Sequence, residues 1–389
     1  MTTVKMVKLG TLIKPAKLQK CGNDDYPVLS MTMHNGLVFQ SDKFKKSVAS
    51  QDKSTYKVVH RNQLVIGFPI DEGVLAMQRI TDAGIVSPAY GIWDVDQTKI
   101  IPEFLEYALR CNRAIDYYKA KLRGSTARRR SLPTPTLLEL DVPLPDIEQQ
   151  KLALTTIHHA KNALDSRQAQ LTKLDELVKA RFVEMFGDML LNSLEWPEKP
   201  LEGLADIVSG ITKGRKTTET GLIEVPYMAV SNVKSGYIDW TTIKTILATK
   251  QEIEQYRLMP DDILMTEGGD PDKVGRGAII KNPLKDSIHQ NHIFRVRLDK
   301  SELLPAYFAE YLQHQKAKRY FLGCAKQTTG IASINMRQLR ALPVLIPPLP
   351  LQNQFAAFVA EVDKSKVEVQ KALDQTQLLF DSLMQQYFG

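Results

Sequence analysis

The sequence predicts an α+β fold of two globular domains in tandem, each followed by a long helix, with the two helices paired as an antiparallel coiled coil. Three observations predict it: an internal repeat, a heptad pattern at the end of each copy, and mixed strand and short-helix patterns ahead of each heptad region. These patterns set the boundaries at 1–145 for domain one, 146–189 for helix one, 190–345 for domain two and 346–389 for helix two.

The repeat is clearest in its later part, where residues from about 100 to 187 recur from about 303 to 389. Each copy opens a helical pattern with proline near the first turn, at 102–106 and 305–309. Three further signatures then occur in both copies: an apolar strand ending in prolines at 142–145 and 346–350, glutamines within 148–150 and 352–354, and a final Phe-Gly at 186–187 and 388–389.

Each proline-rich segment precedes a helical pattern of about 38 residues, which is about 57 Å at 1.5 Å per residue. Apolar residues recur there at heptad spacing, and stripes this narrow are typical of coiled coils. The stripe of the first helix contains Ile157, Leu164, Leu171, Val178 and Met185. The stripe of the second contains Phe355, Val362, Val369, Leu373, Phe380 and Leu383, with polar Lys366 and Thr376 as its breaks.

Two packings would bury such stripes. Each helix can lie on its own domain as an ordinary amphipathic helix, or the two helices can pair with each other. A seven-residue period sustained over five repeats favours pairing. If the pair is antiparallel, it forms a fixed spacer with one domain at each end.

The globular parts mix strands and short helices. Strand-like runs at Asn62–Phe68, Asp262–Thr266 and His292–Leu298 alternate with Gly and Asn turns. The proline-bounded segment Trp196–Pro200 marks the start of the second domain.

The composition of the 389-residue chain indicates a soluble globular protein, with 43% hydrophobic and 24% charged residues. No apolar run is long enough for a membrane span, and residues 1–9 lack the apolar core of a secretion signal, so we expect a cytoplasmic protein with no membrane partner. Three scattered cysteines predict neither disulfides nor a metal knuckle. The net charge of +7 favours a polyanionic partner.

Motifs for catalysis, cofactors and metals are missing. The chain has no phosphate-binding loop for a nucleoside triphosphate and no Asn-Pro-Pro-Tyr segment to hold a flipped adenine. His289 and His292 would point to opposite faces of a strand, which does not suit a metal. Pro260-Asp261 is better explained as a solvated turn than as part of a nuclease site. We therefore expect a binding role with no catalytic, cofactor-binding or metal residue in this chain.

Basic and polar loops are the remaining candidates for function, because Lys and Arg contact phosphates and Ser, Thr and Gln contact phosphates or base edges. One such loop lies at the same place in each repeat, and two further basic segments contain glycine. The candidate DNA-binding residues are Arg123, Ser125, Thr126, Arg128, Arg129, Arg130, Lys213, Arg215, Lys216, Lys273, Arg276, Lys326, Gln327, Thr328 and Thr329. We further expect Gly275 to let the backbone approach a phosphate.

Several segments, in this order, resemble the target-recognition domain of type I restriction-modification specificity subunits. They are Asp262–Thr266 with Gly268, Val274–Arg276, His289–Val296, Ser333–Leu339, and Ile346–Pro350 with Gln352. In the first half, 142–150 and 174–187 match, and 64–68 is an approximate counterpart of 262–266.

The resemblance implies that each domain is a target-recognition domain that binds one half of a bipartite, asymmetric double-stranded DNA site. It implies that the helices set the gap and bind two methyltransferase subunits, and that restriction-translocase subunits join them. S-adenosylmethionine, ATP and Mg would then belong to the partner subunits.

Two other functions stay open at this stage. A stand-alone DNA-binding regulator or architectural protein would use the same loops without a methyltransferase. A coiled-coil adaptor with merely solvated basic loops would show no salt-dependent affinity for DNA.

Overall fold

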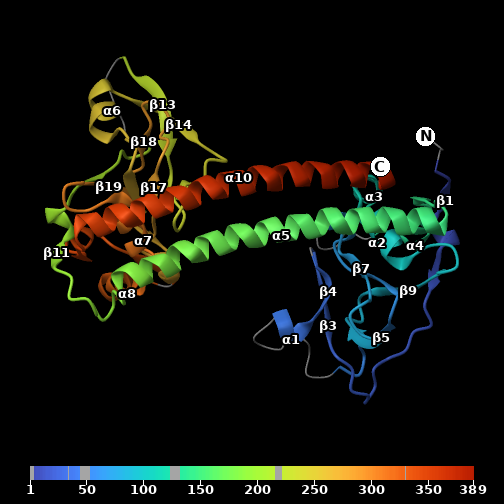
Figure 1. Cartoon of the computed structure of the whole chain (residues 1–389). Coiled ribbons are helices and arrows are strands. Elements are labelled where there is room, and N and C mark those ends of the chain that lie inside the picture. The colour runs from blue at the N-terminus through green and yellow to red at the C-terminus, as the bar shows by residue number, and fades with distance from the viewer. Residues whose placement is uncertain (1–3, 34, 44–52, 123–131, 215–220, 329) are drawn as a thin grey trace. The chain divides into compact units, whose positions relative to one another are not determined.

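The computed structural model describes residues 4–33, 35–43, 53–122, 132–214, 221–328 and 330–389 (Figure 1). The chain forms two compact units, one of Met1–Gln168 with Lys371–Gly389 and the other of Ala169–Gln370. Each unit therefore contains one globular domain and a part of both long helices.

The first unit is built on an antiparallel four-stranded sheet in the order β2-β9-β6-β7. The strands are β2 (Ile13–Pro15), β6 (Leu64–Ile66), β7 (Leu75–Met77) and β9 (Gly91–Val95). Leu64 on β6 lies opposite Met77 on one side and Trp93 on the other. These three residues belong to the buried core under helices α2 (Pro102–Arg110) and α3 (Asn112–Lys121).

The second unit has a sheet of the same kind, in the order β12-β19-β15-β17. Its strands are β12 (Ala205–Ser209), β15 (Asp262–Thr266), β17 (Gly277–Ile280) and β19 (Ile293–Leu298). Ile263 pairs with Val296, and both belong to the core that includes α7 (Pro305–Tyr311) and α8 (Gln315–Cys324). The strands expected at 62–68, 262–266 and 292–298 are thus β6, β15 and β19.

The two units share further elements in the same chain order. We call these elements, together with the four-stranded sheets and the helices described above, the common frame. A two-stranded ribbon pairs β1 (Met6–Lys8) with β10 (Asp141–Pro143), and its counterpart pairs β11 (Glu198–Pro200) with β22 (Pro343–Leu345). The frame also contains the short helices η1 (Leu9–Thr11), η2 (Ile70–Glu72), α4 (Thr134–Leu138), η4 (Leu201–Gly203), η6 (Pro271–Lys273) and α9 (Met336–Arg340). The internal repeat therefore extends to the sheets.

Outside the common frame the units differ, and we call these parts the variable regions. The first unit adds a hairpin of β3 (Leu29–Thr32) with β4 (Gly36–Phe39), an antiparallel pair of β5 (Lys57–His60) with β8 (Ala83–Val86), and helix α1 (Gln40–Lys43). The second adds two three-stranded sheets, helix α6 (Lys250–Tyr256) and η5 (Val230–Asn232). Their strands are β13 (Ile223–Met228), β14 (Lys244–Ala248) and β18 (Ile288–His289), then β16 (Gly268–Gly269), β20 (Lys326–Thr328) and β21 (Ile331–Ser333).

The two long helices are α5 (Ile147–Phe186) and α10 (Leu349–Phe388), each of 40 residues. That length corresponds to about 60 Å of continuous helix. Figure 1 shows both as uninterrupted ribbons.

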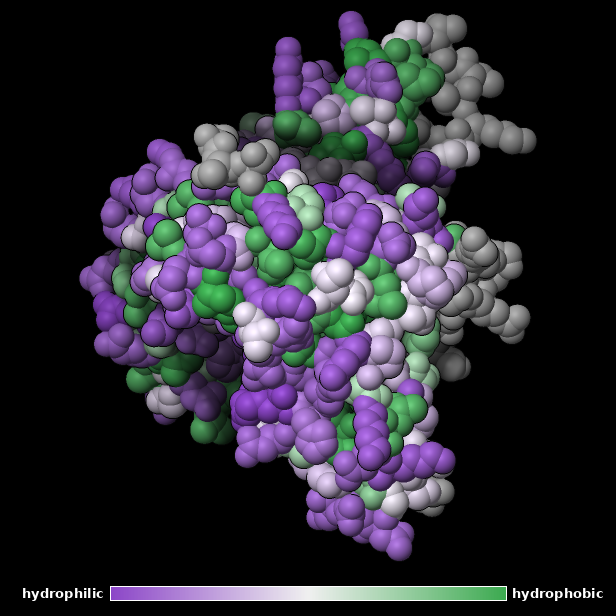
Figure 2. All heavy atoms as spheres, turned by 90° about the vertical axis from the view of Figure 1, so that its right-hand side faces the viewer, coloured by the Kyte–Doolittle hydropathy of each residue, from purple (hydrophilic) through white to green (hydrophobic). Residues whose placement is uncertain are grey.

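Hydrophilic side chains are interspersed with apolar ones over the face shown in Figure 2, as on most water-exposed protein surfaces. Within the described residues, no helix combines the length and apolar character needed to cross a membrane.

Candidate nucleic-acid interface

A buried glutamine ties the start of each long helix to its domain. In the first unit, Gln150 Oε1 accepts a hydrogen bond from the Ile101 amide (2.8 Å), and Nε2 donates to the carbonyls of Lys99 (3.1 Å) and Pro145 (2.8 Å). The side chain is fully buried. All of its hydrogen bonds are to backbone, so it fixes the helix start rather than another side chain. We call this arrangement the glutamine bridge.

The second unit repeats the glutamine bridge at Gln352, which is also fully buried. Its Oε1 accepts from the Leu304 amide (2.8 Å), and its Nε2 donates to the carbonyls of Glu302 (3.0 Å) and Pro347 (2.8 Å). Both bridges join a long helix to the residue that precedes the proline-initiated helix of the frame. The repeated glutamines in the sequence therefore have a positional role.

The far end of each long helix is held by its Phe-Gly terminus. Phe388, at the end of α10, lies in the core of the first unit with its ring 4.8 Å from that of Phe104. Phe186, at the end of α5, lies in the core of the second unit, 4.8 Å from the ring of Tyr307. Each helix thus starts from its own domain and ends in the core that contains the other domain's frame.

Both polar breaks in the heptad stripe of α10 have partners on α5 inside the same unit. Lys366 forms an ion pair with Asp175 (2.5 Å) in the second unit. Thr376, largely buried, accepts a hydrogen bond from Arg167 in the first unit. Polar pairs at such positions set the register of paired helices. Each unit thus contains one polar contact between α5 and α10 at a break in the stripe.

The heptad residues are shielded from solvent to different degrees. Those near the domains, Ile157, Val178, Phe355 and Val362, are buried within the two unit cores. The remainder are partly buried: Leu164, Leu171, Met185, Val369, Leu373, Phe380 and Leu383. Stripe residues near the helix ends therefore join a domain core, and α5 contacts α10 within each unit.

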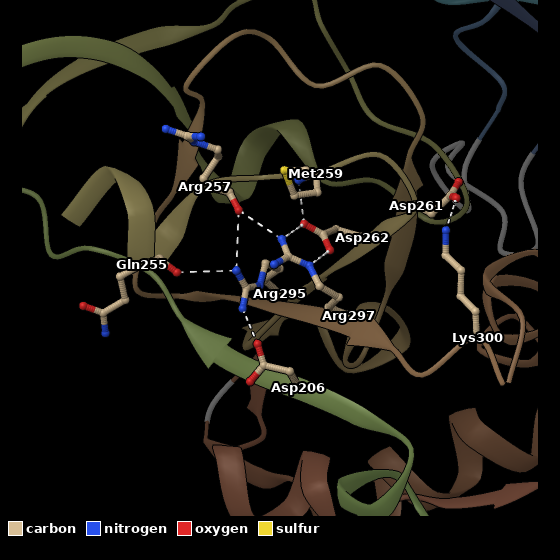
Figure 3. A network of polar contacts seen from close by, with 9 residues as sticks. All are labelled: Asp206, Gln255, Arg257, Met259, Asp261, Asp262, Arg295, Arg297 and Lys300. Carbon is tan, nitrogen blue, oxygen red and sulfur yellow. Dashed lines mark hydrogen bonds and ion pairs between the residues drawn. The ribbon is translucent and has the colours of Figure 1, made fainter. Parts of the chain in front are cut away.

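A polar network joins a variable region of the second unit to its frame (Figure 3). Arg297 makes two hydrogen bonds to the buried Asp262 carboxylate (2.7 and 2.8 Å), and this contact raises the pKa of the Arg297 guanidinium. Arg295, which lies beside it on β19, pairs with Asp206 of β12 (2.5 Å). Burial lowers the pKa of Arg295.

The same two arginines donate to backbone carbonyls at the end of α6. Arg297 bonds to the Arg257 carbonyl (3.2 Å), and Arg295 lies within 3.4 Å of the Gln255 carbonyl. Because α6 belongs to the variable region and β19 to the frame, the network fixes one to the other. These cations are used internally and are not DNA-binding candidates.

The structure describes only some of the predicted DNA-binding residues. Those outside the described residues are Arg123, Ser125, Thr126, Arg128, Arg129, Arg130, Arg215, Lys216 and Thr329. Lys213 and Lys326 are exposed, and Gln327 and Thr328 lie with Lys326 on β20. Lys273 and Arg276 line one pocket, together with Lys234 and Lys318.

Two residues of the basic segments have roles in packing and in the frame. A Cβ atom on Gly275 would lie 2.1 Å from the Phe321 ring, and the residue has φ of +70°. Glycine is therefore needed for close packing on α8 and for the backbone conformation. Lys316, which precedes the second loop, pairs with Glu198 (2.7 Å) with little exposure, so it supports the frame.

The two histidines and the aspartate considered for metal binding or catalysis make contacts within their own domain. His289 is buried and its Nδ1 lies 3.1 Å from the Ile293 carbonyl, whereas His292 is exposed and pairs with Glu267. The described residues contain no cluster of His, Cys, Asp and Glu that could hold a metal. Asp261 occupies a turn with φ of +73° and pairs with Lys300. The three cysteines are free thiols.

The flanks of the two long helices differ between units. In the first unit, ion pairs join three frame and helix residues, since Arg79 lies 2.5 Å from Glu103 and Glu103 lies 3.0 Å from His158. At the positions equivalent to Glu103 and His158, the second unit has Ala306 and Ala360, and both line a groove of about 1280 Å³. The shared frame therefore presents unequal surfaces.

Comparisons with known proteins agree with this architecture. The family model for the type I restriction modification DNA specificity domain matches residues 193–376. The chain is 22% identical over 266 residues to the type I restriction enzyme EcoKI specificity subunit of Escherichia coli, covering 64% of this chain and 57% of that protein. It is 23% identical over 267 residues to the StySPI specificity subunit of Salmonella potsdam, with the same coverage of 64% and 57%.

The fold is also similar to a solved structure from a study of complex assembly and conformational transition in a type I R-M system. That comparison has a TM-score of 0.59 and 15% identity, and it covers 99% of this chain and 97% of the other. The matches to the curated relatives span less than two thirds of those proteins.

Proposed function

We propose that the chain is a specificity subunit of a type I restriction-modification system and that it recognises a bipartite, asymmetric sequence in double-stranded DNA for catalytic partner subunits. One observation carries the proposal: the same frame occurs twice, with the same glutamine bridges at Gln150 and Gln352, while the attached variable regions differ. A repeated support with two different attachments suits a site with two different halves.

Each globular domain would recognise one half-site. A bidentate contact to a base edge contributes about 1–3 kcal/mol of discrimination, so a few contacts in each domain suffice for a short half-site. The network of Arg295 and Arg297 supports this role, because it fixes α6 of the variable region to the frame sheet. Rigid elements keep contacting side chains in place without a large ordering cost.

The long helices would set the gap between the half-sites as an antiparallel coiled coil. Support comes from the length of α5 and α10, from their start and end in different domain frames, and from the contacts Lys366–Asp175 and Arg167–Thr376. Two recognition domains joined by a stiff spacer bind together only when the half-sites are at the matching separation.

The chain would contribute no catalytic group. Two methyltransferase subunits would supply S-adenosylmethionine chemistry, and restriction-translocase subunits would supply the ATP- and Mg-dependent steps. Exposed leucines favour docking on the long helices: Leu177 on α5 is 47% exposed and Leu379, its equivalent in the repeat on α10, is 54% exposed. Leucine at interfaces is buried on association, and equivalent positions on two helices suit two copies of one partner.

Affinity purification followed by methylation mapping of the host genome tests the proposal. We expect methyltransferase subunits to co-purify, and we expect deletion of this chain to remove adenine methylation from one bipartite motif only. Tight, sequence-specific DNA binding by the isolated chain, with no co-purifying methyltransferase and no lost motif, would instead identify a stand-alone regulator.

A further inference from the structure

The second unit contains a small pocket of about 280 Å³ lined by four basic side chains from three segments of the chain. Lys234 follows η5, Lys273 and Arg276 flank the turn at Gly275, and Lys318 lies on α8. We call these four residues and the space between them the basic pocket. The three segments are about 40 residues apart in the sequence, so the fold brings them together.

Its positive charge is only partly balanced. Lys234 and Lys273 each pair with an aspartate that does not line the pocket. Within the described part of the chain, neither Arg276 nor Lys318 has a carboxylate partner, and the buried Arg276 Nε has no hydrogen-bond acceptor. No carboxylate is among the described residues that line the pocket. An anion is therefore the complementary ligand.

The walls of the basic pocket are fixed by packing and hydrogen bonds. Gly275 lies so close to Phe321 that any larger residue would collide with the ring. Two other lining residues are joined by hydrogen bonds, since the Ser235 hydroxyl donates to Gln313 Oε1 (2.5 Å) and Gln313 Nε2 donates to the Gly277 carbonyl (3.3 Å). A preformed site loses little conformational freedom when it binds its ligand.

We propose that the basic pocket holds one phosphodiester group of the DNA backbone, next to the half-site recognised by the second unit. The inference rests on the proposed function and adds a specific backbone contact to it. Pockets for drug-sized ligands measure about 300–1,000 Å³, so this smaller pocket suits a compact anion. The lining also includes Tyr237, and tyrosine hydroxyls commonly contact phosphate. Such a contact positions the protein on the duplex and carries no base information.

The test uses the complex of the full chain with its methyltransferase subunits and the double variant Arg276→Gln/Lys318→Ala. Binding to cognate and unrelated duplexes is measured as a function of salt concentration. Loss of one phosphate contact should reduce the slope of log K against log salt by about 0.9 and weaken binding about eightfold at 0.1 M salt. Both duplexes should be affected alike, and the methylated sequence should not change.

Two controls separate the pocket from general charge effects. Arg276→Lys keeps the charge and should retain most of the slope, and Lys285→Ala removes an exposed charge outside the pocket and should leave the slope unchanged. An unchanged melting temperature shows that the double variant is folded. An unchanged salt slope in the double variant would overturn the inference. An equal reduction of the salt slope in Lys285→Ala would also overturn it.

A free anion is the competing ligand. If inorganic phosphate raises the melting temperature of the wild-type chain but not of the double variant, while the DNA salt slope is the same in both, the pocket binds free phosphate and the inference is wrong. Failure of the proposed function is distinguishable, because the wild-type complex would then show no preference for any bipartite sequence.

Discussion

Replacing the buried glutamine Gln352 with leucine should destabilise the second unit strongly. The substitution keeps the size of the side chain but replaces its amide with apolar groups, and so removes the hydrogen bonds to the Leu304 amide and to the carbonyls of Glu302 and Pro347. Each bond contributes about 1 kcal/mol net, and an unpaired buried group costs more. We therefore expect a loss of about 3 kcal/mol or more in the free energy of unfolding.

Differential scanning calorimetry measures this loss. For a unit of 150–250 residues, 1 kcal/mol shifts the melting temperature by about 2–4 °C, so Gln352→Leu should lower it by about 6–12 °C. Gln150→Leu should have a similar effect on the first unit, because Gln150 makes the same three bonds. Gln354→Leu is the matched control, because Gln354 lies on the same helix but is exposed. This variant should change the melting temperature little.

A second variant tests the direction of the bonds. Gln352→Glu puts an acceptor oxygen opposite the two carbonyls, so the carboxyl should be protonated in the folded state and have a raised pKa. Its folded state should then lose stability as the pH rises, because the unfolded chain ionises at a lower pH. A Gln352→Leu shift below about 2 °C, or a Gln352→Glu stability independent of pH between 5 and 8, would refute the role of the glutamine bridge.

Three other predictions concern separate sites. The double variant Leu177→Glu/Leu379→Glu should reduce co-purification of methyltransferase by at least tenfold. Its melting temperature should stay within about 2 °C of the wild-type value, because both side chains are exposed. Undiminished co-purification would exclude docking at these two leucines. Burial lowers the pKa of His289 to about 4, so as the pH falls this histidine is protonated in the unfolded chain before it is protonated in the folded one. The free energy of unfolding should therefore fall by about 3 kcal/mol between pH 6.5 and 4. Urea unfolding of His289→Gln should not show this pH dependence. Gly210→Ala should lower the free energy of unfolding by more than about 3 kcal/mol, because its Cβ would lie 1.9 Å from the His289 carbonyl oxygen. Gly203→Ala is the control, since its Cβ would meet no atom within 4 Å. Equal thermal stability of the two variants would contradict the close packing of Gly210 on His289.

The long helices could be predicted from the sequence because their signals are local. Heptad spacing, the proline before the helix and the terminal Phe-Gly each follow from neighbouring residues. The equivalence of β6 with β15 was harder to see. Any apolar, strand-forming side chain satisfies a buried sheet position, so Leu64–Ile66 and Asp262–Thr266 keep the same place in the sheet with little sequence in common.

The candidate site was less accessible to prediction because its contacts are tertiary. Lys234 gave no signal of its own, and only the fold places it beside Lys318 and Arg276. The role of Gly275 depends on Phe321, which lies on a helix much later in the chain. A basic residue in the sequence also does not reveal whether it is free, as Arg297 shows by its contacts with Asp262.

Insertion of one heptad into both long helices tests the central claim most directly. Suitable positions are after Gln168 in α5 and after Gln370 in α10, where the two units meet along the chain. Seven residues add about 10.5 Å to a helix, which is about three base pairs at 3.4 Å each. Insertion into one helix alone should abolish cognate binding, because it breaks the antiparallel register.

Binding-site selection on the complex with methyltransferase subunits provides the measurement. The account predicts the same two half-sites separated by a gap about three base pairs longer than that of the wild type. An unchanged gap, or altered half-sites at the original separation, would contradict it.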